Sequence, residues 1–129
     1  MQKKINTISG IEVLGVYRER RFSPGKISED AAILDATLSR LSDAAYRVRA
    51  LPPEDLQDMT PKPDLVLSMA QSVRALDFLD GWHKSGVKII NSVQSVRSCY
   101  RKALIRCLQD AGIPMPPSRI VKTGELERR

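Results

Sequence analysis

Three arginines, Arg18, Arg20 and Arg21, stand together in a polar stretch that follows a short apolar run near the start of the chain. Guanidinium groups bind carboxylates and phosphates through paired hydrogen bonds. In an extended loop, alternate side chains project the same way, so these arginines could meet one anion together. A solvated basic loop without a ligand is the other interpretation. The pattern predicts a site for the carboxylate or phosphate of a small substrate.

Two further polar positions follow apolar runs and are candidates for substrate contact. Ser68 comes near the end of the run at 64–69, and Asn91 and Ser92 come directly after the run at 87–90. Asn91 and Ser92 can also be explained as an ordinary helix cap. We predict that Ser68, Asn91 and Ser92 lie close to the arginines and contact the substrate.

The chain offers little for catalysis or for a metal ion. His83 is the only histidine, so a Ser–His–Asp set is not credible, and neither G-x-G-x-x-G nor a P-loop motif is present. Cys99 and Cys107 are about two turns apart in a predicted helix, which is too far for a disulfide. Two cysteines and one histidine are also too few ligands for a zinc site. We therefore predict no catalytic residue, no metal ligand and reduced thiols in a cytoplasmic protein.

The elements that must position these residues alternate along the chain. Runs of strand length occur at 11–16, 46–50, 64–69 and 87–90. One amphipathic helix is predicted from Ser28, with the stripe Leu34, Leu38, Leu41 and Ala45, and another from Val73 to residues 85–86. A further helical stretch at 92–111, in one or two pieces, is stopped by Gly112.

This alternation predicts an α/β fold with a Rossmann-like parallel sheet and helices on both faces, in the strand order 2-1-3-4. Ligands bind such sheets beyond the carboxyl ends of the strands. We expect the loops 17–25, 68–72 and 91–95 to meet there.

Length, composition and charge limit the classes of protein to which this chain could belong. The 129 residues suit one ordinary domain, 42% of them are hydrophobic, and no apolar run approaches the roughly 20 residues of a membrane span. The net charge of +6 is uneven, at +4 over residues 1–26, −3 over 27–96 and +5 over 97–129. Basic ends suit nucleic acid or a small anion. The aromatic share of 5% and the short basic runs favour the small anion.

The most specific pattern lies in residues 86–116. The segment Gly-Val-Lys-Ile-Ile-Asn-Ser at 86–92 is followed by a predicted helix, the basic residue Arg101 and the segment Ala-Gly-Ile-Pro-Met-Pro at 111–116. This order resembles the junction between the first two domains of ATP-grasp ligases, a superfamily that includes glutathione synthetase and the ribosomal-protein glutamate ligases. The resemblance covers roughly residues 11–122 and implies a pre-ATP-grasp domain.

The resemblance implies an ATP-dependent carboxylate–amine ligase. ATP and magnesium would activate a small carboxylate substrate as an acylphosphate, which an amine attacks. The family's phosphate-contacting Asp-Lys pair reads Tyr100-Arg101 here, eleven residues before Gly112. Arginine can replace lysine at a phosphate, although a solvated helix charge explains Arg101 equally well. ATP and magnesium are thus expected in the full-length protein, with Arg101 as the contact and no tight binding to this chain alone.

The same resemblance places a boundary near Pro117. Residues 1–117 would form the N-terminal domain, and 118–129 would begin the missing C-terminal ATP-grasp domain, which is the expected partner, or form a tail. Residues 118–122 could form a strand that is mobile in a monomer or pairs between two copies in a homodimer. The remaining ATP and magnesium residues would lie on a longer native chain or be lost in a stand-alone relic.

Two interpretations outside the ligases stay open. One is a non-catalytic, flavodoxin-like module that binds a small anion. The other is a nucleic-acid-binding accessory domain, whose affinity would fall steeply with added salt.

Overall fold

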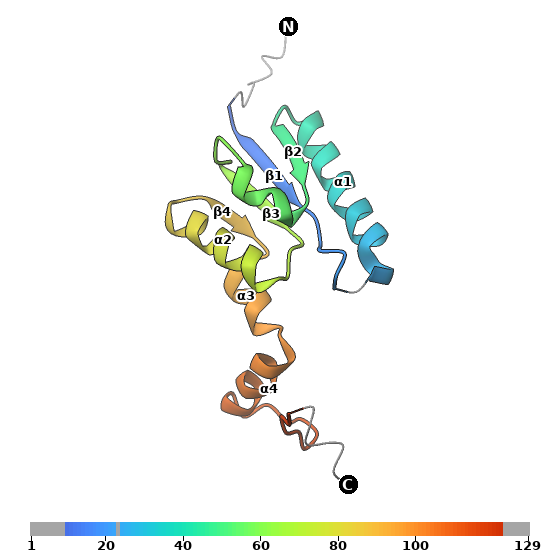
Figure 1. Ribbon diagram of the computed structural model, residues 1–129, viewed down its shortest axis with the longest axis vertical. Helices are drawn as coiled ribbons and strands as arrows, with labels where there is room; N and C mark the ends of the chain where they lie inside the picture. Colours follow the sequence, from blue (N-terminus) through green and yellow to red (C-terminus); the bar gives the residue numbers. More distant parts are fainter. Residues whose placement is uncertain (1–9, 23, 123–129) are drawn as a thin grey trace, which may run out of the picture. The chain divides into compact units, whose positions relative to one another are not determined.

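The computed structural model describes residues 10–22 and 24–122, and the chain divides into two compact units, residues 1–93 and 94–129. The first unit holds a parallel sheet flanked by helices (Figure 1). Its strands are β1 (Glu12–Val16), β2 (Arg47–Leu51), β3 (Leu65–Ser68) and β4 (Lys88–Ile90). Its helices are η1 (Pro24–Lys26), α1 (Ile27–Asp43), η2 (Pro53–Asp58) and α2 (Val73–Lys84).

The sheet has the order β2-β1-β3-β4 with every pairing parallel, so the predicted α/β, Rossmann-like fold and strand order are confirmed. In the central strand, Val13 pairs with Val48 of β2 and with Leu65 of β3. Because all four strands run the same way, their carboxyl ends meet at one edge of the sheet. That edge is called the carboxyl edge below.

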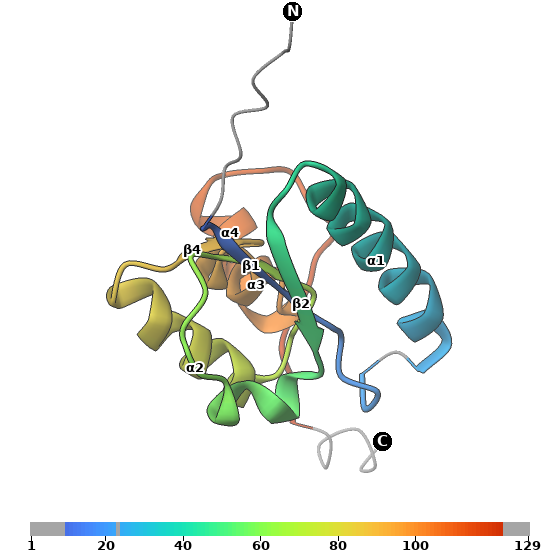
Figure 2. The ribbon, with the colours of Figure 1, turned by 90° about the horizontal axis from the view of Figure 1, so that it is seen from above.

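The two long helices of the first unit cover opposite faces of the sheet, as Figure 2 shows. Side chains alternate along a strand, so Val13 and Gly15 of β1 face one way and Leu14 and Val16 the other. Val13 packs with Leu34 and Leu38 of α1. A Cβ atom at Gly15 would lie 2.6 Å from Leu38 Cδ1, so glycine at this position lets α1 approach the sheet closely.

The end of α1 differs from the predicted stripe. Leu34 and Leu38 are buried as expected, but Ala45 lies beyond the helix, is exposed and has a φ of 68°. There the backbone N–H of Tyr46 bonds the carbonyl of Leu41, which closes the helix in the left-handed turn usually made by glycine. The periodic pattern therefore runs two residues past the true end of the helix.

The second unit contains most of α3 (Val93–Ser98) and all of α4 (Arg101–Asp110). Residues 92–111 were predicted to be helical in one or two pieces, and the structure shows two helices there. Both cysteines are free and exposed, and Cys99 lies between the two helices. The strand considered for residues 118–122 does not form: these residues are irregular, because a single apolar pair gains too little burial to offset its ordering entropy.

None of the helices in residues 10–22 and 24–122 is both long and apolar enough to cross a membrane.

Candidate functional site

The candidate site lies at the carboxyl edge, where β1 continues into the arginine loop, residues 17–22. The structure shows a hollow of about 660 Å³ there, called the arginine hollow below. It is formed by the arginine loop, α1 and the segment after β2, and it is lined by Tyr17, Arg18, Arg20, Arg21, Ile27, Ala31, Asp35, Pro52 and Glu54. The three predicted arginines are thus brought together in one wall. A hollow of this volume is in the range of small-molecule sites.

Arg18 is held by α1. Its Nε lies 2.5 Å from Oδ2 of Asp30, and both side chains are less than a fifth exposed. The two atoms form an ion pair but are not aligned for a hydrogen bond, and neither has another partner in the described part of the chain. Much of the charge of Arg18 is therefore neutralised internally.

A second pair fixes the hollow's wall beside Arg18. The Tyr17 hydroxyl donates a hydrogen bond of 2.5 Å to Oδ1 of Asp35 on α1. This hydrogen bond, with smaller contributions from burial and from the carboxylate's charge, raises the pKa of Tyr17 above its ordinary value of 10.0. The phenol therefore stays protonated at neutral pH and keeps its position as a donor to Asp35.

Arg20 and Arg21 differ from Arg18 because both are exposed. Within residues 10–22 and 24–122, neither side chain makes an ion pair or a hydrogen bond. A guanidinium without an internal partner can bind an external anion without first breaking a contact. Of the three arginines, these two are the ones suited to hold a ligand.

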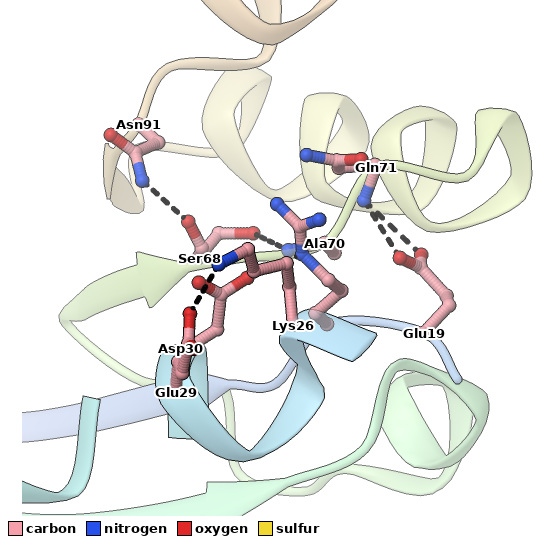
Figure 3. Close-up of polar contacts among 9 residues, drawn as sticks. Glu19, Lys26, Glu29, Asp30, Ser68, Ala70, Gln71 and Asn91 are labelled. Atoms are coloured by element: carbon pink, nitrogen blue, oxygen red, sulfur yellow. Dashed lines mark hydrogen bonds and ion pairs between the residues drawn. The ribbon is translucent and has the colours of Figure 1, made fainter. Parts of the chain in front are cut away.

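Glu19, between these arginines, was not predicted from the sequence. It is only 5% exposed, and its carboxylate accepts hydrogen bonds from the backbone N–H groups of Gln71 (Figure 3) and Ser72, each at 2.9 Å. Burial by itself raises the pKa of Glu19, but hydrogen bonds from the Ser72 hydroxyl and from these N–H groups outweigh it, and the net pKa is lowered. Glu19 is therefore ionised at neutral pH.

The partner of Glu19 is the start of α2. Ser72 is the N-cap of this helix, and its Oγ accepts from the backbone N–H of Ala75 at 3.2 Å. The first turn of α2 carries no acidic residue of its own, so Glu19 supplies the negative charge that stabilises a helix N-terminus. Two features of the sequence could have indicated this contact. Glu19 is an acidic residue within a basic loop, and α2, which begins more than 50 residues later, has no acidic residue in its first turn.

A second hollow, of about 240 Å³, lies between the arginine loop, η2 and the start of α2. It shares Arg21 and Glu54 with the arginine hollow and adds Glu19, Phe22, Ser72 and Arg74. Arg74 donates from Nη2 to Gln57 Oε1 at 2.8 Å. Of the two arginines in this smaller hollow, Arg21 is the one whose guanidinium makes no hydrogen bond or ion pair within the described residues.

Ser68 and Asn91 meet as expected, through hydrogen bonds of their own. Asn91 Nδ2 donates to the backbone carbonyl of Ser68 at 2.8 Å, and Ser68 Oγ accepts from the N–H of Ala70 at 3.2 Å (Figure 3). Asn91 has a φ of 45°, a conformation that asparagine tolerates better than most residues. Neither residue lines the arginine hollow or the second hollow.

Two remaining predicted positions are Ser92 and Arg101. Ser92 is exposed after β4 and already takes part in a polar interaction within the protein. Arg101 is the exposed first residue of α4, in the second unit. In the described residues, no three His, Cys, Asp or Glu side chains are grouped to hold a metal ion.

Comparisons of the chain with models of protein families, with characterised proteins and with solved structures find no match in any of the three.

Proposed function

We propose that this chain binds a small anionic molecule, such as a carboxylate substrate, in the arginine hollow. The observation that carries the proposal is the pair Arg20 and Arg21, exposed at the carboxyl edge and without an internal partner among the described residues. The carboxyl edge of a parallel sheet is where such folds bind ligands.

The anion site depends on the available donors of Arg20 and Arg21 rather than on a net positive charge of the wall. Asp30 neutralises Arg18, and the hydrogen bond from the neutral Tyr17 hydroxyl leaves the negative charge of Asp35 in place. Arg20 and Arg21 therefore balance Asp35 and Glu54, the two acids of the wall. A hydrogen bond to a charged group contributes about 1.5–3 kcal/mol, and ordering two exposed arginines costs about 0.5–1.5 kcal/mol each. The site therefore supports weak to moderate affinity.

We propose further that this anion site belongs to the substrate side of an ATP-dependent carboxylate–amine ligase. The support is the resemblance of residues 86–116 to ATP-grasp ligases, together with the α/β fold of the first unit. In that scheme Arg101 contacts a nucleotide phosphate, ATP and magnesium are held mainly by the C-terminal ATP-grasp domain, and this chain is inactive alone. A non-catalytic anion-binding module is the alternative.

Titration with succinate, a small dicarboxylate, tests the anion site. Amide chemical shifts of residues 17–22 are followed at pH 7 and low ionic strength, where screening is weak. We expect saturable binding by the wild-type chain and its loss in the double variant Arg20→Gln/Arg21→Gln. The matched control Arg40→Gln/Lys84→Gln removes the same charge from exposed positions outside the hollow and should bind as wild type does. Equal affinities of the two double variants would refute the site.

The ligase part of the proposal needs a separate test. The native gene is read beyond the codon for Arg129, and a following segment with a lysine-bearing sheet and acidic magnesium ligands would support it. A stop codon directly after Arg129 would favour the non-catalytic module.

A further inference from the structure

We infer that Glu19 is a positioning residue for the anion site. Its carboxylate holds the arginine loop against the start of α2 and thereby keeps Arg20 and Arg21 at the arginine hollow. The inference rests on the proposed function, because it concerns the same two arginines.

The contact joins segments that are far apart in the sequence. Glu19 accepts from the N–H groups of Gln71 and Ser72, which are 52 and 53 residues further along the chain. Glu19 is buried at 5% exposure, whereas its neighbours Arg20 and Arg21 are exposed. The loop is therefore attached to α2 through the acid and presents its arginines to solvent.

The backbone of the loop also depends on Glu19. The N–H of Phe22 donates to the backbone carbonyl of Glu19 at 3.3 Å, which closes a turn around Arg20 and Arg21. The preceding backbone bond, from Tyr17 N–H to the carbonyl of Leu51, lies on the other side of Glu19. The two arginines are thus inside a turn whose anchored end is Glu19, and releasing its side chain frees that end.

Neutralising Glu19 would change the affinity for an anion in opposite directions, depending on whether Glu19 repels the anion or positions the arginines. If Glu19 were only a nearby negative charge, its neutralisation would strengthen the binding of an anion by removing repulsion. If Glu19 positions the arginines, its neutralisation weakens binding, because the binding-competent loop becomes less populated. If the loop holds its binding-competent conformation about a tenth of the time, the apparent Kd for the anion rises about tenfold.

The experiment compares Glu19→Gln and Glu19→Ala with two controls, by succinate titration and by amide hydrogen exchange. Asp55→Asn removes one negative charge from an exposed position on η2 that lines neither hollow. Trp82→Phe loosens the far end of α2 without touching the loop. All variants are measured at a temperature where denaturation curves show them fully folded. Glu19→Gln keeps the size of the side chain and one acceptor oxygen, so it remains informative if the alanine variant does not fold.

We expect both Glu19 variants to bind succinate more weakly, about tenfold for alanine if the loop is competent a tenth of the time, with faster exchange at residues 20–22. Both controls should bind as wild type does. Unchanged or tighter binding by Glu19→Gln, or unchanged exchange in the loop, would overturn the inference while leaving the arginine site intact. If the wild-type chain shows no saturable binding, or Arg20→Gln/Arg21→Gln binds normally, the proposed function fails and the positioning role falls with it.

Discussion

Replacing Glu19 by glutamine also tests how the first unit is stabilised. The substitution keeps the shape of the side chain but removes the negative charge that faces the start of α2. It leaves one acceptor oxygen and places an amide NH₂ against N–H donors. We expect the free energy of unfolding to fall, and the fall to depend on pH.

The size of the effect follows from the contacts. Two backbone N–H groups, of Gln71 and Ser72, donate to the carboxylate. Hydrogen bonds to charged groups contribute about 1.5–3 kcal/mol each, and a charge at a helix N-terminus adds about 0.3–1 kcal/mol. These contributions share one carboxylate and are not additive, and its burial opposes them. Because glutamine keeps part of the bonding, we expect a loss of about 2 kcal/mol at pH 7.

The pH dependence has a definite sign. The pKa of Glu19 is lowered in the folded protein from its ordinary value of 4.5, so the unfolded chain takes up the proton first as the pH falls. The stabilisation is fully present above pH 4.5 and is lost as the pH falls through the lower pKa of the folded state. Glutamine does not titrate, so the difference between wild type and Glu19→Gln should shrink over this acid range.

The assay is urea denaturation from pH 7 down to the acid range, followed by the fluorescence of Trp82. Trp82 is the single tryptophan, is buried in α2 and lies edge-to-face against Phe78 at 5.1 Å, so it reports the first unit. Other acids titrate equally in both proteins and cancel in the difference. Equal stability at pH 7, or a difference that stays constant into acid, would refute the role given to the carboxylate.

Four shorter predictions follow from other positions. Gly15→Ala should lower the unfolding free energy by about 1–3 kcal/mol, because its Cβ would press on Leu38; an unchanged urea midpoint would contradict this. Ala45→Gly should raise the unfolding free energy by about 0.5–1 kcal/mol, because relief of the φ of 68° outweighs the greater entropy of the unfolded chain; an unchanged or lower urea midpoint would contradict this. Calorimetry should give an ATP affinity weaker than micromolar, since Arg101 offers a single basic contact. Deleting residues 118–129 should leave the Trp82 transition unchanged and shift any dimer toward monomer in sedimentation; unfolding would disprove the boundary near Pro117.

Much of the fold could be predicted because its signals are local. Alternation of apolar runs with amphipathic stretches predicts βαβ units, and short connections limit the order of the strands. The prediction was wrong where local periodicity continues past an element: Ala45 fits the stripe of α1 but lies in the turn that ends it. Residues 118–122 are irregular in the single chain, and their pairing between two copies stays a prediction.

The sequence by itself determined that Arg18, Arg20 and Arg21 lie in one loop after the first strand, at the edge where such sheets bind ligands. Only the tertiary structure decided that Arg18 is paired with Asp30 while Arg20 and Arg21 stay available. It alone revealed Glu19, because the parallel pairing of β1 with β3 brings the residues that follow these strands together across more than 50 positions of sequence. Spacing along a chain predicts contacts within an element, whereas a hydrogen bond between loops depends on which strands are neighbours.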